Sequence, residues 1–147
     1  MSPIKHTVIS GVLSLGFFAL TKSWTGTLAC FLSGIFIDID HFFDFWIVKK
    51  RFKCGYDDLM TYGIREKAGI VFLIFHSYEL LAALWFAIYL YDLNAVWLGI
   101  AWGTTVHLLA DQMSNPLRPP GYFFFYRMKY GFAKEHLLKK EFYQQMV

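Results

Sequence analysis

The chain has 147 residues and a formal net charge of +3; 56% of its residues are hydrophobic and only 17% are charged. A typical globular domain carries about 25% charged residues, so the composition favours one small and strongly apolar domain. The weak positive charge gives no reason to expect a nucleic-acid partner. The two cysteines, Cys30 and Cys54, are not part of a CxxC pattern, which argues against a zinc site built from thiolates.

Four apolar segments approach the length of a membrane-spanning helix, which needs about 20 mostly apolar residues. These predicted spans are 4–20, 24–48, 68–91 and 95–113. Short polar links join the first span to the second and the third to the fourth, so each pair is expected to form an antiparallel hairpin. The sequence therefore predicts an all-α integral membrane protein. It would be a single domain of four transmembrane helices, followed by a cytoplasmic, interfacial helical tail over 116–147.

Basic residues determine the predicted orientation. They concentrate in the link 49–67 and in the tail, whereas the hairpin turns contain only Lys22. The positive-inside rule then places both termini in the cytoplasm. The first apolar segment also suggests a signal peptide, but the sequence that follows it, 21–24, is a poor cleavage site. We therefore expect a retained helix.

Each predicted span contains one histidine, and three of the four have acidic residues close by. These histidines are His6, His41, His76 and His107. Ionisable groups inside apolar segments are costly, which favours a functional role over a packing role. In the predicted topology all four approach the cytoplasmic side, where they could meet in one cavity.

The spacing of the acidic residues indicates a metal site. His107 and Asp111 are four residues apart, so they project from one face of a helix. The predicted ligands are four histidines and three carboxylates: His6, Asp38, Asp40, His41, His76, His107 and Asp111. A single catalytic zinc takes three protein ligands and keeps one position open, so seven ligands predict two or more divalent ions. Histidine with carboxylate suits zinc, manganese or iron.

Two further carboxylates are predicted to act in catalysis. Asp44 lies four residues after Asp40 and on the same helical face, and Glu79 follows His76-Ser77. Either Asp44 or Glu79 could orient a ligand histidine or act as a general base. Ser77 is expected to bond to the main chain, since no triad pattern accompanies it.

The order of these motifs resembles the YdjM-type family of bacterial inner-membrane proteins, which are described as metal-dependent hydrolases. The matching features are an N-terminal His6, a glycine-rich stretch leading to Asp-x-Asp-His at 38–41, His76-Ser77, and His-x-x-x-Asp at 107–111. The chain departs from the family at Ile37, where proline is common, and at 74–75, where a basic residue is common. Zinc-dependent phospholipase C enzymes are more remotely similar. The resemblance implies a bacterial inner-membrane location, zinc as the first choice of metal, and hydrolysis of a phosphoester, including one in a lipid.

The tail contains the cations that such a substrate would need. A run of aromatic residues over 122–130 includes basic residues, which is typical of an interfacial element. Arg118, Arg127 and Lys129 could bind a substrate phosphate. The pattern favours the alternative, in which these cations only anchor the tail.

The leading hypothesis is therefore a membrane-embedded, metal-dependent hydrolase that acts on a phosphoester of a membrane lipid at the cytoplasmic face. A metal-ion or proton transporter could use the same His/Asp cluster, although transporter sites usually lie near the membrane midplane. A two-iron oxygenase and a protein with a closed, structural metal are further alternatives. The exposed aromatic residues would also suit a homo-oligomer.

Overall fold

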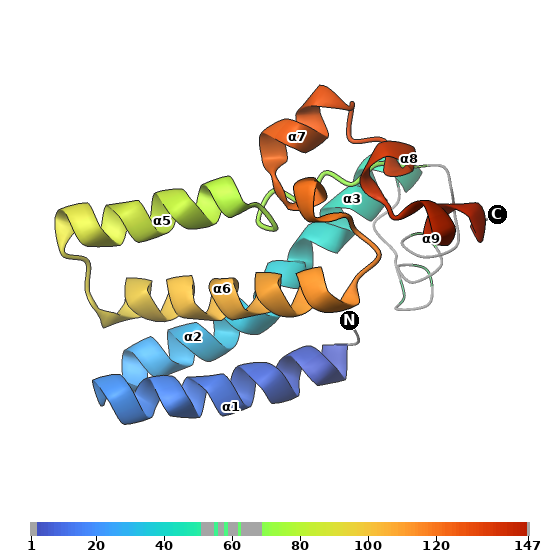
Figure 1. Cartoon of the computed structure of the whole chain (residues 1–147). Helices are drawn as coiled ribbons and strands as arrows, with labels where there is room; N and C mark the ends of the chain where they lie inside the picture. The colour runs from blue at the N-terminus through green and yellow to red at the C-terminus, as the bar shows by residue number, and fades with distance from the viewer. Residues whose placement is uncertain (1–2, 51–54, 56–57, 59–61, 63–68, 147) are drawn as a thin grey trace. The chain divides into compact units, whose positions relative to one another are not determined.

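The computed structural model is mostly helical (Figure 1), and it describes residues 3–50, 55, 58, 62 and 69–146. The chain forms two compact units. Unit 1 comprises Met1–Ile37 and Glu79–Asn115, and unit 2 comprises Asp38–Tyr78 and Pro116–Val147. Most of the basic link over 49–67, including Cys54, lies outside the described residues.

Unit 1 is built from four helices: α1 (Pro3–Thr21), α2 (Trp24–Phe36), α5 (Tyr78–Tyr91) and α6 (Ala95–Ser114). Local capping explains where two of them begin. The Ser23 hydroxyl accepts a hydrogen bond from the main-chain N–H of Gly26, at 3.2 Å. The Asn94 side chain accepts one from Val96 N–H, at 3.1 Å. Such caps satisfy donors that the first helical turn leaves unpaired, so the tight turns expected near 21–23 and 92–94 are present.

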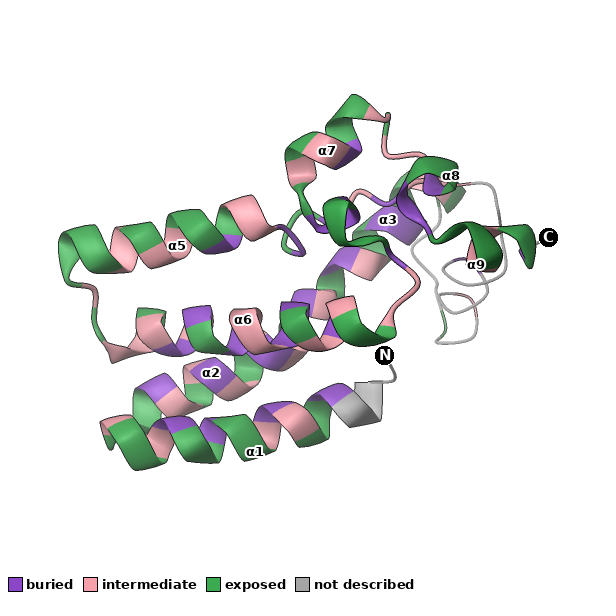
Figure 2. Ribbon diagram, viewed as in Figure 1, coloured by how far each residue is buried: buried purple, intermediate pink, exposed green. Residues whose placement is uncertain are grey.

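The contact between α2 and α6 depends on glycine. A Cβ atom on Gly99 would collide with the main chain at Gly26, and one on Gly103 would collide with the main chain at Cys30. The absence of side chains at these positions lets the two backbones approach closely. On α6, Gly99, Gly103, His107 and Asp111 follow one another at intervals of four residues and are all buried (Figure 2). The close packing thus continues directly into the polar residues of the helix.

The described elements of unit 2 are short: η1 (Ile37–Ile39), α3 (Asp40–Lys49), η3 (Pro119–Tyr122), α7 (Phe124–Lys129), α8 (Lys134–Leu137) and α9 (Lys140–Gln144). Its buried apolar residues include Phe45, Leu73, Tyr122 and Leu137. Isolated antiparallel bridges pair Ile70 with Ala133 and Leu117 with Leu138. The segment 69–77 is not helical, and its path is set by contacts that form part of the candidate site.

The predicted four-span membrane architecture is wrong. Within the described residues, none of the helices combines the length and the apolar character that crossing a bilayer requires. The predicted span 24–48 is interrupted, because α2 ends at Phe36 and a 3-10 turn separates it from α3. Within the predicted span 68–91, residues 69–77 are not helical. Helix α5 begins at Tyr78, and its 14 residues extend about 21 Å at 1.5 Å per residue. The hydrocarbon core is about 30 Å thick.

The inferences that depended on four spans are wrong for the same reason. These are the membrane-embedded character of the protein, its inner-membrane location and the cytoplasmic placement of both termini. The tail over 116–147, predicted as an interfacial helical element, is a set of short helices in unit 2 that contribute buried residues such as Arg127 and Leu137.

Candidate metal centre

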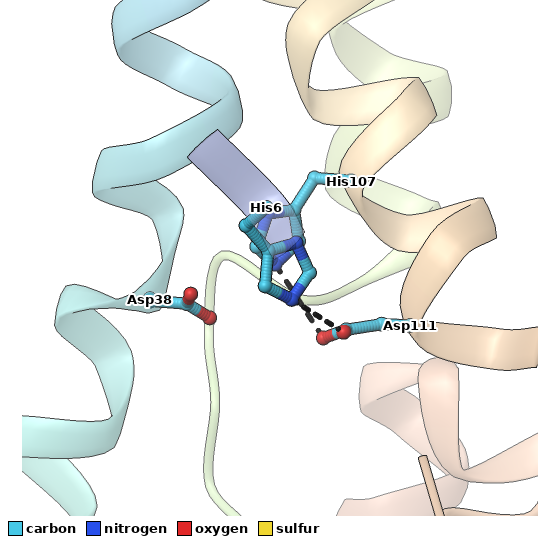
Figure 3. A group of neighbouring side chains, drawn as sticks. All are labelled: His6, Asp38, His107 and Asp111. Carbon is cyan, nitrogen blue, oxygen red and sulfur yellow. Dashed lines mark ion pairs between the residues drawn. The ribbon is translucent and has the colours of Figure 1, made fainter. Parts of the chain in front are cut away.

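Two histidines and one aspartate converge inside unit 1. His6 comes from α1, and His107 and Asp111 come from α6 (Figure 3). The Nε2 atom of His6 lies 3.0 Å from one Asp111 carboxylate oxygen, and the Nε2 atom of His107 lies 3.4 Å from the other. The two imidazole rings are stacked, with centroids 4.1 Å apart and planes inclined by 15°. Both Nε2 atoms therefore face a single carboxylate.

All three side chains of this group, which we call the unit 1 triad (His6, His107 and Asp111), are withdrawn from solvent. Their exposed fractions are 3%, 2% and 2%. Burying ionisable groups is costly unless they are paired with one another or bind a metal. His107 and Asp111 lie four residues apart on one face of α6, as predicted from their spacing.

The orientation of His107 is fixed by the main chain of α2. Its Nδ1 atom lies 2.8 Å from the carbonyl oxygen of Gly34. A carbonyl oxygen can only accept a hydrogen bond, so Nδ1 must carry the proton. In the neutral ring, the lone pair is then on Nε2 and points towards Asp111. Metal-ligating histidines characteristically donate their other ring N–H to such an acceptor.

A second group with the same composition lies inside unit 2, and we call it the unit 2 triad: Asp38, His41 and His76. Each offers one ligand atom, and these atoms lie within 4.8 Å of one another. The carboxylate of Asp38 is 3.7 Å from His41 Nε2 and 3.5 Å from His76 Nε2. This group is less uniformly buried: the side chains of His41 and Asp38 are 45% and 32% exposed, and that of His76 is 1% exposed.

Asp40 supports His76 from behind. One of its carboxylate oxygens lies 3.2 Å from His76 Nδ1 and accepts hydrogen bonds from the main-chain N–H groups of Phe75 and His76. With the proton on Nδ1, the Nε2 lone pair of His76 faces Asp38. The arrangement carboxylate–histidine–ligand site is typical of metal centres. Asp40, predicted as a ligand, is thus placed as a partner of the ligand histidine.

Asp44 extends the same support along α3. Its two carboxylate oxygens accept hydrogen bonds from the N–H groups of Phe72, at 3.0 Å, and Leu73, at 3.2 Å. Burial raises the pKa of Asp44 from 3.8 to about 6, although these two hydrogen bonds and the positive charge of Arg127 lower the pKa. Asp40 and Asp44 share a helical face, as predicted, and together they determine the path of segment 72–76.

The remaining predicted residues are placed as follows. Glu79 is half-buried in the first turn of α5. Arg118 is exposed and donates to the His136 carbonyl, at 3.3 Å. Lys129 is exposed, and its Nζ lies over the Tyr130 ring, 5.6 Å from the ring centroid. Arg127 is fully buried, and its guanidinium donates hydrogen bonds to main-chain carbonyls.

Sequence reasoning missed two parts of the site. The Gly34 carbonyl gives no signal in the sequence beyond a glycine within the matched motif. The burial of Arg127 gives none, because a basic residue inside an aromatic run is equally typical of a surface element.

Each triad contains two histidines and one carboxylate and could bind a metal. The unit 1 triad is the buried one. Three protein ligands with an open position are the donor set of catalytic zinc, and the same set also suits non-haem iron. No family model, curated protein or solved structure matches the chain.

Proposed function

We propose that the protein is a metal-dependent hydrolase that cleaves a phosphoester. The observation that carries the proposal is the unit 1 triad, in which two Nε2 atoms and a carboxylate converge while almost completely buried. The resemblance of the motifs to the YdjM-type family and to zinc-dependent phospholipase C enzymes supports the same reaction. Zinc is the first choice of metal, with manganese or iron as alternatives, and two triads suit two ions.

A bound divalent ion would supply a water of lowered pKa and would polarise a phosphoryl oxygen. The chain itself supplies the ligands and their orientation. His107 is held in one tautomer by the Gly34 carbonyl, and His6 is held by stacking against the His107 ring. Ligands held in this way need no rearrangement when a metal binds, which favours tight binding.

The two carboxylates predicted to act in catalysis lie in different settings. Asp44 uses both oxygens to accept main-chain N–H groups, so it is suited to holding the backbone. Glu79 is half-buried in the first turn of α5 and is the other carboxylate predicted to accept a proton. Arg118 and Lys129 are exposed cations in unit 2 that could contact a substrate phosphate.

Two classes of substrate fit the proposed reaction. The resemblance favours a phosphodiester in a lipid, and a small soluble phosphoester would be cleaved by the same chemistry. Hydrolysis of bis(p-nitrophenyl) phosphate and of a short-chain phosphatidylcholine, each with added zinc or manganese, separates the two substrates.

The matched variants are His107→Ala, Asp111→Asn and His136→Ala. His136 is the fifth histidine and is outside both triads, paired with Glu135 on the surface. We expect hydrolysis by the unmodified protein and by His136→Ala, and none by the two triad variants. Metal binding without hydrolysis of either substrate would refute the hydrolase and favour a structural metal.

A further inference from the structure

The backbone of unit 2 is strained at Leu73, three residues before His76. Leu73 has a positive φ of 37°, a conformation that a branched, bulky residue rarely adopts. Strain of this kind persists only where the surrounding structure enforces it, and it gathers at functional sites. Leu73 is also buried, with 7% of its surface exposed, so its side chain and its main chain are both held in place.

Charged side chains enforce this turn from two sides. On one side, Asp44 accepts the Leu73 N–H. On the other, the Arg127 guanidinium donates through Nη2 to the Leu73 carbonyl, at 2.8 Å. The same guanidinium donates through Nη1 to the carbonyls of His76 and Gly121, each at 3.0 Å. One side chain therefore joins both ends of the turn, Leu73 and His76, to η3.

The burial of Arg127 makes these bonds costly to leave unmade. Its side chain is 0% exposed, and a buried guanidinium needs acceptors for its donors. The planar fork of arginine can reach several carbonyls at fixed angles, whereas a lysine ammonium is a single flexible donor centre. The Phe124 ring also helps to hold the guanidinium, whose Cζ atom lies 5.8 Å from the ring centroid. The residue predicted to bind a substrate phosphate is thus used inside the fold.

We propose that Arg127 is a positioning residue, which fixes the strained turn at Leu73 and thereby aims the His76 ring at Asp38 and His41. Asp40 sets the ring tautomer, and Arg127 sets where the main chain presents the ring. The inference rests on the metal binding of the proposed function, at the unit 2 triad, and does not depend on hydrolysis.

The test is a titration with Co²⁺ in a His107→Ala background, which disables the unit 1 triad. Visible absorption of bound Co²⁺ reports the ligand set, and the titration gives the affinity. In this background, the parent protein with Arg127 is compared with the variants Arg127→Lys and Arg127→Gln. Arg118→Gln is the matched control, because Arg118 is exposed and donates to a carbonyl away from the turn. Thermal unfolding without Co²⁺ is measured in parallel.

We expect Arg127→Gln to weaken Co²⁺ binding by about 10- to 100-fold, the usual cost of losing a partner behind a ligand, and to change the absorption bands. The Co²⁺ affinity of Arg127→Lys should lie between those of the His107→Ala parent and of Arg127→Gln. If Arg127→Gln does not fold, the affinity of Arg127→Lys tests the inference. Arg118→Gln should bind like the parent. Unchanged Co²⁺ affinity and bands in the folded Arg127 variants would overturn the inference, as would a lowered unfolding temperature alone. Absence of Co²⁺ binding in the parent would also overturn it. Co²⁺ binding by the unmodified protein without hydrolysis of either phosphoester would refute only the hydrolase.

Discussion

The Nδ1 atom of His107 is hydrogen-bonded to the carbonyl oxygen of Gly34, 73 residues earlier in the chain. This bond leaves the Nε2 lone pair directed at Asp111. Gly34 also lies where α2 approaches Ser10, since a Cβ atom there would be 2.5 Å from the serine hydroxyl oxygen. The close packing of unit 1 and the orientation of its ligand histidine thus depend on the same glycine.

Replacing Gly34 by alanine should therefore weaken both stability and metal binding. The new methyl group would push α2 away from Ser10 and displace the carbonyl that holds His107. We expect a loss of about 1–3 kcal/mol in the free energy of unfolding, the usual cost of overpacking. Zinc affinity should fall by about tenfold or more. Urea denaturation and zinc titration measure the two effects.

Gly16→Ala is the matched control for this substitution. A Cβ atom on Gly16 would meet nothing within 4 Å, and alanine is favoured over glycine in a helix interior by about 0.5–1 kcal/mol. Gly16→Ala should leave the protein equally stable or more stable, with unchanged zinc affinity. Equal effects of the two substitutions would show that the Gly34 carbonyl has no special role.

Asp111→Asn should remove zinc from the unit 1 triad while preserving the shape of the side chain. An amide lacks the negative charge that balances a divalent cation, and it presents only one oxygen to the two histidines. The triad should retain no zinc at micromolar concentrations, as judged by equilibrium dialysis. Asp92→Asn, at the exposed turn between α5 and α6, serves as the control. Zinc retention by Asp111→Asn equal to that of Asp92→Asn would contradict the assigned ligand.

The helical spacing of particular residues could be predicted from the sequence. His107 and Asp111, and likewise Asp40 and Asp44, lie on shared faces because a helix repeats every 3.6 residues. The long-range contacts could not be predicted in this way. No spacing rule connects His107 to Gly34 or Arg127 to Leu73, because these contacts depend on how separate elements pack.

The error about the membrane has a related cause. A run of apolar residues indicates burial but does not say whether the run is one straight helix. The predicted span 68–91 includes residues 69–77, yet these are non-helical. Within this segment the Asp40 and Asp44 carboxylates accept the N–H groups that a helix would use, those of Phe72, Leu73, Phe75 and His76. The carboxylates of Asp40 and Asp44, which helped to identify the site, thus hold a non-helical segment where the apolar pattern predicted a helix.

The raised pKa of Asp44 predicts a specific pH dependence of stability. With a pKa of about 6 in the folded protein against an ordinary value of 3.8, this group binds its proton more tightly in the fold. Its contribution is fully present below about pH 4 and is lost as the pH rises through 6, by roughly 3 kcal/mol. Urea denaturation from pH 4 to 7 with EDTA should show this loss relative to Asp44→Asn. Parallel curves for the two proteins would contradict the assignment.

Zinc should stabilise the protein by binding only its folded state. At a free concentration 100 times the dissociation constant, one site adds about 2.7 kcal/mol to the free energy of unfolding. Thermal unfolding should therefore shift upwards with zinc and return with EDTA. His6→Ala should reduce the shift, because His6 supplies one of the three ligands of the unit 1 triad. An equal shift in His6→Ala and the unmodified protein would exclude this triad as the zinc site.

The most direct test of the metal centre is the metal content per chain, measured by elemental analysis after purification without chelators and after loading with zinc. The compared proteins are the unmodified chain, His136→Ala and the double variant His76→Ala/His107→Ala, which removes one ligand from each triad. We predict equal stoichiometry, of at least one zinc per chain, in the first two and no bound zinc in the double variant. An unmodified chain without zinc, or a double variant that retains the full amount, would contradict the metal centre.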